Sequence, residues 1–267
     1  MRQRQVISLI FLFKIFAMTL KSKVKFVKSL QLKKYRVQAQ SFVVEGWKGV
    51  EALINSDFQV SLLAVTDSYY QQAWELVKRN KKEISDGLHV VSSGELERMG
   101  GVEANDSALA VARMKPEEKP IIGRERILVL DDIRDPGNMG TMIRTADWFG
   151  IRQVIASKNS VDFYNPKVIR STMGSYCDVQ VSYVDLPEFL KHSKVPVYGA
   201  FLEGDHIQNI HFENNALIVI GNESNGISPD ILPFIHRRVS IQGFGKAESL
   251  NASVAAGVIL YAATLKR

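Results

Sequence analysis

Residues 131–150 read DDIRDPGNMGTMIRTADWFG, and an apolar run at residues 127–130, typical of a short buried strand, leads directly into them. Residues 135–138 form a turn signal, because proline fixes φ while glycine and asparagine tolerate left-handed conformations. From Thr141 the apolar residues recur at helical spacing, and Gly150 is placed to end that helix. The pattern therefore predicts a strand, a tight loop and a helix.

Asn138 and Arg144 fall near the carboxyl end of the predicted strand, which is the edge where open α/β sheets usually bind ligands. For this stretch alone, an ordinary strand–helix turn with a surface arginine explains the residues equally well. Two later stretches repeat the plan: residues 216–226, ALIVIGNESNG, and residues 238–261, RVSIQGFGKAESLNASVAAGVILY. Each places an apolar strand before a polar, glycine-bearing loop, and the second ends in a helix rich in small residues.

In this order and spacing, the three stretches resemble the three motifs of the SpoU family of RNA ribose 2′-O-methyltransferases, part of the SPOUT class of knotted methyltransferases. The resemblance covers roughly the last half of the chain. It implies a parallel-sheet α/β domain with a C-terminal trefoil knot. It also implies S-adenosylmethionine as the cofactor and a homodimer in which two catalytic domains complete the cofactor crevice. Short apolar strands separated by helices independently favour a parallel sheet covered on both faces.

The resemblance also assigns a candidate site. The polar candidates for catalysis are Asn138, Arg144, Glu223, Ser249 and Asn251. The candidates for cofactor contact, chiefly through backbone atoms, are Gly221, Ile241 and Leu250, with Ala200 and Phe201 as weaker candidates after the preceding strand. Each polar residue taken alone could be a loop cap, and for Ser249 alone that interpretation is favoured. The five together favour a functional site.

Arg144 matches the arginine to which the family assigns the central catalytic role, often as general base. A guanidinium is essentially always protonated at neutral pH, so bidentate capture of a substrate phosphate is an equally good role. The chain also departs from the family pattern, with Gln242 and Gly243 where proline and methionine usually follow the strand, and Ala252 in place of a valine. Backbone contacts to the cofactor should survive these changes, whereas loop rigidity and substrate preference depend on them more.

Other cofactors are poorly supported by the sequence. Gly243 and Gly245 begin a dinucleotide-binding loop, but Glu248 occupies the position of its third glycine. Residues 221–226 have the glycine spacing of a phosphate loop, but Ile227 stands where its lysine must be. The histidines show no spacing typical of metal ligands, and a single cysteine excludes an internal disulfide. No metal site is predicted.

The 267 residues include 46% hydrophobic and 23% charged ones, which is typical of a globular protein. The net charge of +6 is unevenly distributed: residues 1–44 contain ten Lys or Arg and no acidic residue, whereas the rest has 24 basic against 28 acidic residues. This basic arm suggests a polyanionic partner such as RNA, although a solvated lysine-rich helix would give the same pattern. Within the arm, residues 21–36 predict an amphipathic helix with a basic face.

Residues 1–17, MRQRQVISLIFLFKIFA, superficially resemble a signal peptide. However, Lys14 interrupts the apolar core, no small-x-small cleavage site follows, and the run is too short to span a bilayer. We interpret this start as an upstream initiation codon, with Met18 as a natural initiator; a membrane anchor is the less favoured alternative. We therefore expect residues 1–20 to be unstructured or mis-assigned, no membrane association, and a cytoplasmic protein.

Strands and helices alternate over some ninety residues after the arm and indicate a small α/β domain. With FVVEGWKGVEALI near its start, this layout resembles the substrate-binding domain that often precedes SpoU catalytic domains. We expect an RNA-binding domain at residues 21–113, a proline-containing linker at 114–126, and a methyltransferase domain at 127–267. These expectations favour ribosomal RNA over transfer RNA as the substrate. A non-catalytic RNA-binding or ribosome-assembly protein of the same fold is the alternative.

Overall fold

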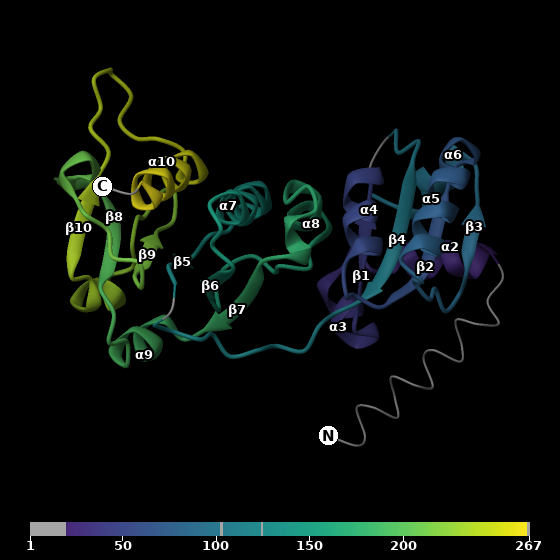
Figure 1. Ribbon diagram of the computed structural model, residues 1–267, viewed down its shortest axis with the longest axis horizontal. Helices are drawn as coiled ribbons and strands as arrows, with labels where there is room; N and C mark the ends of the chain where they lie inside the picture. The colour runs from purple at the N-terminus through teal and green to yellow at the C-terminus, as the bar shows by residue number, and fades with distance from the viewer. Residues whose placement is uncertain (1–19, 102–103, 124, 266–267) are drawn as a thin grey trace. The chain divides into compact units, whose positions relative to one another are not determined.

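The structure of the protein is a computed structural model that describes residues 20–101, 104–123 and 125–265. These residues divide into two compact units, whose helices and strands are labelled in Figure 1. The N-terminal unit contains the described residues up to Pro116 together with residues 164–177. The C-terminal unit contains residues 117–163 and residues 178 onward.

The N-terminal unit is an α/β structure. Its strands are β1 (Ser41–Glu45), β2 (Val60–Val65), β3 (Leu88–Val90) and β4 (Ala108–Arg113). Its helices are α2 (Leu20–Ser29), α3 (Lys33–Ala39), α4 (Trp47–Asn55), α5 (Asp67–Arg79), α6 (Ser93–Met99), α8 (Pro166–Ser171) and the 3₁₀ helix η1 (Ser175–Cys177). The strands lie in the order β1-β4-β2-β3, with β4 antiparallel to both neighbours and β2 parallel to β3. Because β1 and β2 are buried along their whole length, the sheet forms the core of this unit.

The helix predicted at residues 21–36 is in fact two helices, α2 and α3. The buried side chain of Arg36 explains the break. Its Nη1 donates to the carbonyl oxygens of Leu30 (2.9 Å) and Gln31 (2.8 Å), which follow the last residue of α2. Lys23 is buried as well, with its Nζ 2.8 Å from Oδ1 of Asp86. Two cations of the basic arm are therefore structural.

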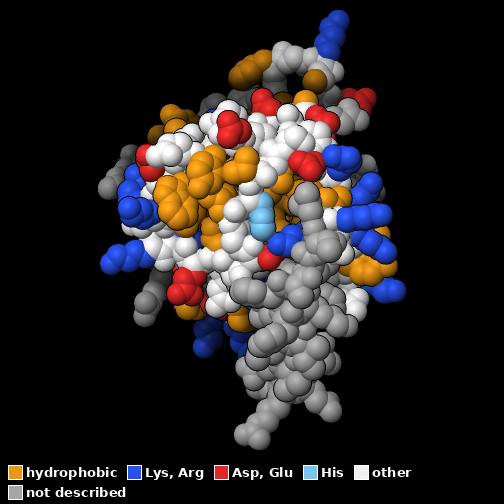
Figure 2. All heavy atoms as spheres, turned by 90° about the vertical axis from the view of Figure 1, so that its right-hand side faces the viewer, with side chains coloured by type: hydrophobic (Ala, Val, Ile, Leu, Met, Phe, Trp, Pro, Cys, Tyr) orange, Lys and Arg blue, Asp and Glu red, His pale blue; other side chains and the backbone are white. Residues whose placement is uncertain are grey.

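Five lysines of the arm are exposed: Lys21, Lys25, Lys28, Lys33 and Lys34. Figure 2 shows lysine and arginine side chains gathered on part of the surface of this unit, beside exposed apolar side chains. The expectation for residues 1–20 falls outside the described residues except at Leu20, where α2 begins. Within the described ranges, no helix has the length and apolar character needed to cross a membrane.

The C-terminal unit confirms the predicted parallel sheet. Its strands are β5 (Ile127–Leu130), β6 (Gln153–Ser157), β7 (Gln180–Val184), β8 (Val197–His206), β9 (Leu217–Ile220) and β10 (Arg237–Ser240). Its helices are α7 (Pro136–Trp148), α9 (Leu186–Lys191), α10 (Ala252–Thr264) and the 3₁₀ helices η2 (Ile207–Asn209) and η3 (Pro229–Phe234). All neighbours in the order β10-β8-β9-β5-β6-β7 are parallel. The central strands β5 and β9 are buried throughout, as their uninterrupted apolar runs predict.

The helix of the first motif, α7, begins at Pro136, five residues before the predicted start at Thr141. The reason is its cap: the Asp135 carboxylate accepts a hydrogen bond from the Asn138 N–H at 2.8 Å, and proline is favourable at the first helical position. Asn138 therefore lies in the first turn of the helix and not in a loop. The helix ends as predicted, since Gly150 has a φ of 73° just beyond it.

Candidate functional site

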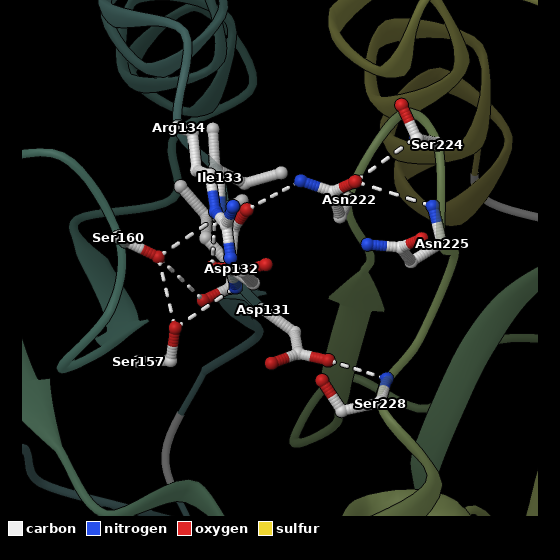
Figure 3. A network of polar contacts seen from close by, with 11 residues as sticks. Asp131, Asp132, Ile133, Arg134, Ser157, Ser160, Asn222, Ser224, Asn225 and Ser228 are labelled. Atoms are coloured by element: carbon white, nitrogen blue, oxygen red, sulfur yellow. Dashed lines mark hydrogen bonds and ion pairs between the residues drawn. The ribbon is translucent and has the colours of Figure 1, made fainter.

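Polar side chains join the loops that follow β5, β6 and β9, three strands that are adjacent in the sheet (Figure 3). Asp131 is buried at the end of β5, and its Oδ2 accepts a hydrogen bond from the N–H of Ser228 at 2.7 Å. The hydroxyl of Ser157, at the end of β6, accepts from the N–H of Asp132 at 2.8 Å. The hydroxyls of Ser157 and Ser160 form a hydrogen bond with each other at 3.0 Å. The loop after β5 is thus held from both sides.

Asn222 connects the loops after β9 and β5 (Figure 3). Its Nδ2 donates to the carbonyl oxygen of Asp132 at 2.8 Å. Its Oδ1 accepts from the N–H groups of Ser224 (2.9 Å) and Asn225 (3.2 Å), which closes the loop after β9 on itself. Gly226 adds two backbone hydrogen bonds with Asn222, at 3.0 and 2.9 Å. Asn222 therefore sets the position of both loops through one side chain.

Gly221, a predicted cofactor residue, is buried where this loop begins. A Cβ atom at this position would stand 2.3 Å from the carbonyl carbon of Gly226, closer than packed atoms can approach. Only glycine therefore allows the closed loop, which is a stronger requirement than the sequence pattern could indicate. The loop presents mainly backbone groups at this point.

Three of the five polar candidates meet in one cluster. Asn138 donates from Nδ2 to Oε1 of Glu223, and Nδ2 of Asn251 donates to Oδ1 of Asn138 at 3.1 Å. Asn251 is also the cap of α10, because its Oδ1 accepts from the N–H of Ser253 at 2.9 Å. We call Asn138, Glu223 and Asn251 the motif cluster, since each comes from a different one of the three stretches. Their hydrogen bonds fix the three stretches relative to one another.

The other two polar candidates lie outside the motif cluster. Arg144 is exposed on α7, and among the described residues its guanidinium has no hydrogen-bond or ion-pair partner. Ser249 is exposed in the segment between β10 and α10, and within the described chain its side chain makes no hydrogen bond to the cluster. An exposed arginine without a partner remains available for an anionic ligand.

The remaining cofactor candidates lie in one strand and one loop. Ile241 and Leu250 are the first and last residues of the segment 241–250; Ile241 is half-buried, and Leu250 is 49% exposed. Ala200 and Phe201 lie within β8 and not after it, because β8 continues to pair with β10 beyond the predicted end. The guanidinium of Arg238 also lies over the ring of Phe201, 4.7 Å from the ring centroid. Phe201 is therefore partly committed to packing in the strand.

Sequence reasoning missed the side chains that hold the loops: Asp131, Ser157, Ser160 and Asn222. Asp131 could have been recognised as a carboxylate directly after an apolar strand. Asn222 could have been recognised because it directly precedes the candidate Glu223. The two serines belong to no motif. Nearby, the Asp132 carboxylate accepts a hydrogen bond from Arg134 and raises the pKa of that guanidinium. In the part of the chain that the structure describes, no group of three or more His, Cys, Asp or Glu side chains could hold a metal.

The comparison with protein families assigns both units. The SpoU rRNA Methylase family matches residues 125–261, and the MRM3-like substrate binding domain matches residues 21–110. A relative from Bacillus subtilis, 23S rRNA (guanosine(2553)-2′-O)-methyltransferase RlmP, is 33% identical over 245 residues, which cover 90% of this chain and 94% of RlmP. The chain therefore belongs to the SpoU rRNA methylase family.

Solved structures agree with this assignment. A TrmH-family protein from Porphyromonas gingivalis is 31% identical, with a TM-score of 0.80 over 92% of this chain and 98% of its own. The SpoU methyltransferase AviRb from Streptomyces viridochromogenes, in complex with the cofactor AdoMet, is 26% identical, with a TM-score of 0.78 over 90% and 96% of the two chains. The fold of this protein is thus that of SPOUT methyltransferases over nearly its whole length.

Proposed function

We propose that this protein transfers a methyl group from S-adenosylmethionine to the 2′-hydroxyl of a ribose in ribosomal RNA. The observation that carries the proposal is the motif cluster, in which hydrogen bonds join Asn138, Glu223 and Asn251 from all three family motifs. A relative that matches nearly end to end is named as a 23S rRNA 2′-O-methyltransferase. A family member that lacked the polar candidates for catalysis would more readily be a non-catalytic RNA-binding protein. In this chain all five polar candidates are present.

The loops at the carboxyl edge of the sheet fit S-adenosylmethionine. When bound, this cofactor supplies a sulfonium methyl group that is already activated for transfer. The loop after β9 would hold it through backbone groups, since Gly221 has no room for a side chain. The segment between Ile241 and Leu250 would form the opposite side. Such backbone contacts need no signature side chain, which explains why the cofactor loops are polar and glycine-bearing.

The residues of this chain would then orient the acceptor ribose. Arg144, exposed and without a partner in the described chain, would either accept the 2′-hydroxyl proton or hold a neighbouring phosphate with its two parallel N–H donors. Glu223 would keep Asn138 oriented through its carboxylate. Asn251 is placed by its role as a helix cap, so its amide needs no further ordering when substrate binds. Ser249 would act, if at all, through the exposed segment and not through the cluster.

The family resemblance supports three further proposals about assembly. The protein would be a homodimer in which α10 packs against a second copy, for which the exposed Val254 and Tyr261 provide apolar surface. The C-terminal region would be threaded as a trefoil knot. The functional domains would be residues 21–113 and 127–267, joined by a linker at 114–126, and the matches at 21–110 and 125–261 support these limits.

A cytoplasmic location is also proposed, because ribosomal RNA is the substrate. The experiment that tests the function is a map of 2′-O-methyl groups in ribosomal and transfer RNA from a strain lacking this gene. We expect one ribosomal RNA site to lose its methyl group and to regain it when purified protein and S-adenosylmethionine are added. Loss of methylation only in transfer RNA, or in no RNA, would overturn the proposal.

A further inference from the structure

The N-terminal unit contains a cavity of about 270 Å³ at the carboxyl end of β1. Residues 44–49, from the end of β1 and the first turn of α4, form one wall. Residues 104–107, which lead into β4, form the second, because β1 and β4 are antiparallel and Glu45 lies opposite Leu109. Ile169 and Arg170 at the end of α8, and Met173 just after it, complete the lining. We call this cavity the Trp47 pocket.

The walls combine a flat aromatic surface with positive charge. Trp47 is half-buried, and its ring lies against that of Tyr69, with centroids 5.3 Å apart and 38° between the planes. This contact packs the indole against a residue of α5, and Trp47 is also part of the pocket wall. Two exposed cations, Lys48 and Arg170, line the pocket against a single exposed carboxylate, Asp106.

The remaining polar groups in the walls are engaged in the fold. Asn105 is 5% exposed, and its Oδ1 accepts from the N–H (3.3 Å) and the hydroxyl (3.2 Å) of Ser107. The buried carboxylate of Glu45 accepts from the N–H of Gly101, with both oxygens at 3.1 Å. These contacts hold the walls in place before any ligand arrives. The groups left to meet a ligand are the indole, the methionine side chain, the two cations and the carboxylate of Asp106.

This chemistry matches one nucleotide of single-stranded RNA. Proteins recognise unstacked RNA bases by stacking them on aromatic side chains, while lysine and arginine contact the phosphates. The volume of about 270 Å³ is slightly below that of ordinary small-molecule sites, so it suits one ring system better than a large ligand. The exposed lysines of the basic arm belong to the same unit and add to its positive charge, which favours binding of an RNA strand.

We propose that the Trp47 pocket binds one unstacked nucleotide of the RNA substrate, with the base against Trp47 and its phosphates beside Lys48 and Arg170. The inference rests on the proposed function, since it takes RNA as the substrate. It adds a specificity site in the substrate-binding unit, formed by residues outside the three methyltransferase motifs. The pocket would select RNA in which a base is already unpaired or can be turned out of its stack.

Two kinds of measurement test this proposal on the full chain. In kinetic assays with ribosomal RNA, Trp47→Ala should raise the KM for RNA about tenfold or more, the scale of one lost stacking contact, with kcat and cofactor affinity unchanged. Trp47→Phe should recover most of the affinity, because phenylalanine keeps a stacking face. The matched control is Trp74→Ala, which removes an exposed tryptophan of α5 from the same unit and should leave KM unchanged.

Binding can also be measured without methyl transfer. The chain has three tryptophans, so a Trp74→Phe/Trp148→Phe variant reports on Trp47 alone by fluorescence. A single-stranded RNA oligonucleotide of mixed sequence should quench this emission to saturation, and a blunt RNA duplex should not. A Lys48→Glu/Arg170→Glu variant of the exposed cations should weaken the quenching, whereas Lys78→Glu/Arg79→Glu, with the same charge change on α5, should have a much smaller effect.

The outcomes separate the pocket from the overall function. If single-stranded RNA does not quench Trp47 and the charge reversal leaves KM unchanged, the pocket proposal is wrong, even when the protein methylates ribosomal RNA. If quenching occurs but no ribosomal RNA is methylated, the proposed function fails while the pocket stands. Should Trp47→Ala fail to fold, the charge-reversal and fluorescence measurements still decide, since both use exposed residues or the intact pocket.

Discussion

Two loops of the C-terminal unit belong to family motifs, but they differ in how firmly they are held by the rest of the unit. The loop after β9, residues 221–228, is held by Asn222, by Asp131 and by its own backbone. The segment between β10 and α10, residues 241–250, is largely exposed, with Phe244 86% exposed and open space beside Gly243. The first loop is fixed by internal hydrogen bonds, whereas most residues of the second face solvent. Two loops that both belong to family motifs therefore differ in their physical properties.

The largest effect is expected for Arg144, because its side chain is exposed on α7 and its proposed role concerns the RNA substrate alone. Arg144→Ala should lower methyl transfer about a hundredfold or more, the scale of a positioned acid–base group, while cofactor affinity stays near that of the wild type. Arg144→Lys should rescue little, since lysine lacks the planar pair of donors. Kinetics and calorimetry would measure both quantities. If Arg144 binds a phosphate, Arg144→Ala should also weaken RNA binding; if it acts as a base, RNA binding should not change. Turnover near that of the wild type would contradict both roles.

The contrast between the loops is tested most directly by adding one methyl group to each. In Gly221→Ala the Cβ would overlap the backbone of Gly226, so the loop after β9 must open. We expect a loss of about 1–3 kcal/mol in unfolding free energy and at least about a tenfold loss of cofactor affinity. Gly243→Ala is the matched control, because no atom lies within 4 Å of the added Cβ. Equal effects of the two substitutions would show that the loops do not differ.

A smaller effect on cofactor affinity is expected from removing the side chain that connects the loops. Asn222→Ala deletes its hydrogen bonds to the carbonyl of Asp132 and to the N–H groups of Ser224 and Asn225. The cost should be about 1–3 kcal/mol in stability, with a several-fold loss of cofactor affinity. Asn225→Ala, in the same loop, should be almost neutral because its interaction uses the backbone N–H, which alanine keeps. Thermal unfolding and calorimetry would compare the pair.

The smallest effect on function is expected in the basic arm, where exposed and buried lysines should behave differently. Changing Lys21, Lys25 and Lys28 to glutamine should lower the salt dependence of RNA binding by about one unit of slope per lost contact. Stability and cofactor affinity should not change. Lys23→Gln should instead lower stability, by about 3–5 kcal/mol, because it breaks the buried ion pair with Asp86. It should leave the salt dependence of RNA binding unchanged. An unchanged salt slope in the triple variant would mean that the exposed lysines are only solvated.

The element types were largely predictable, but several boundaries were not. Uninterrupted apolar runs correctly indicated the buried strands β5 and β9, and Gly150 correctly marked the end of α7. The start of α7 was misplaced because the turn residues Asp135 and Pro136 also serve as a helix cap and a first helical residue. The basic arm was predicted as one helix because periodicity gives no indication that Arg36 is buried against the end of α2. Local patterns identify elements, but side-chain contacts decide where they stop.

The sequence by itself determined the family, the parallel sheet and the identity of the polar candidates, because these depend on residue types, order and spacing. Only the tertiary structure decided which candidates act together. It brought Asn138, Glu223 and Asn251 within hydrogen-bond reach, left Arg144 and Ser249 exposed, and closed the loop at Gly221. These are contacts between segments up to 113 residues apart. Their geometry is set by how the strands are ordered in the sheet, which no local pattern encodes.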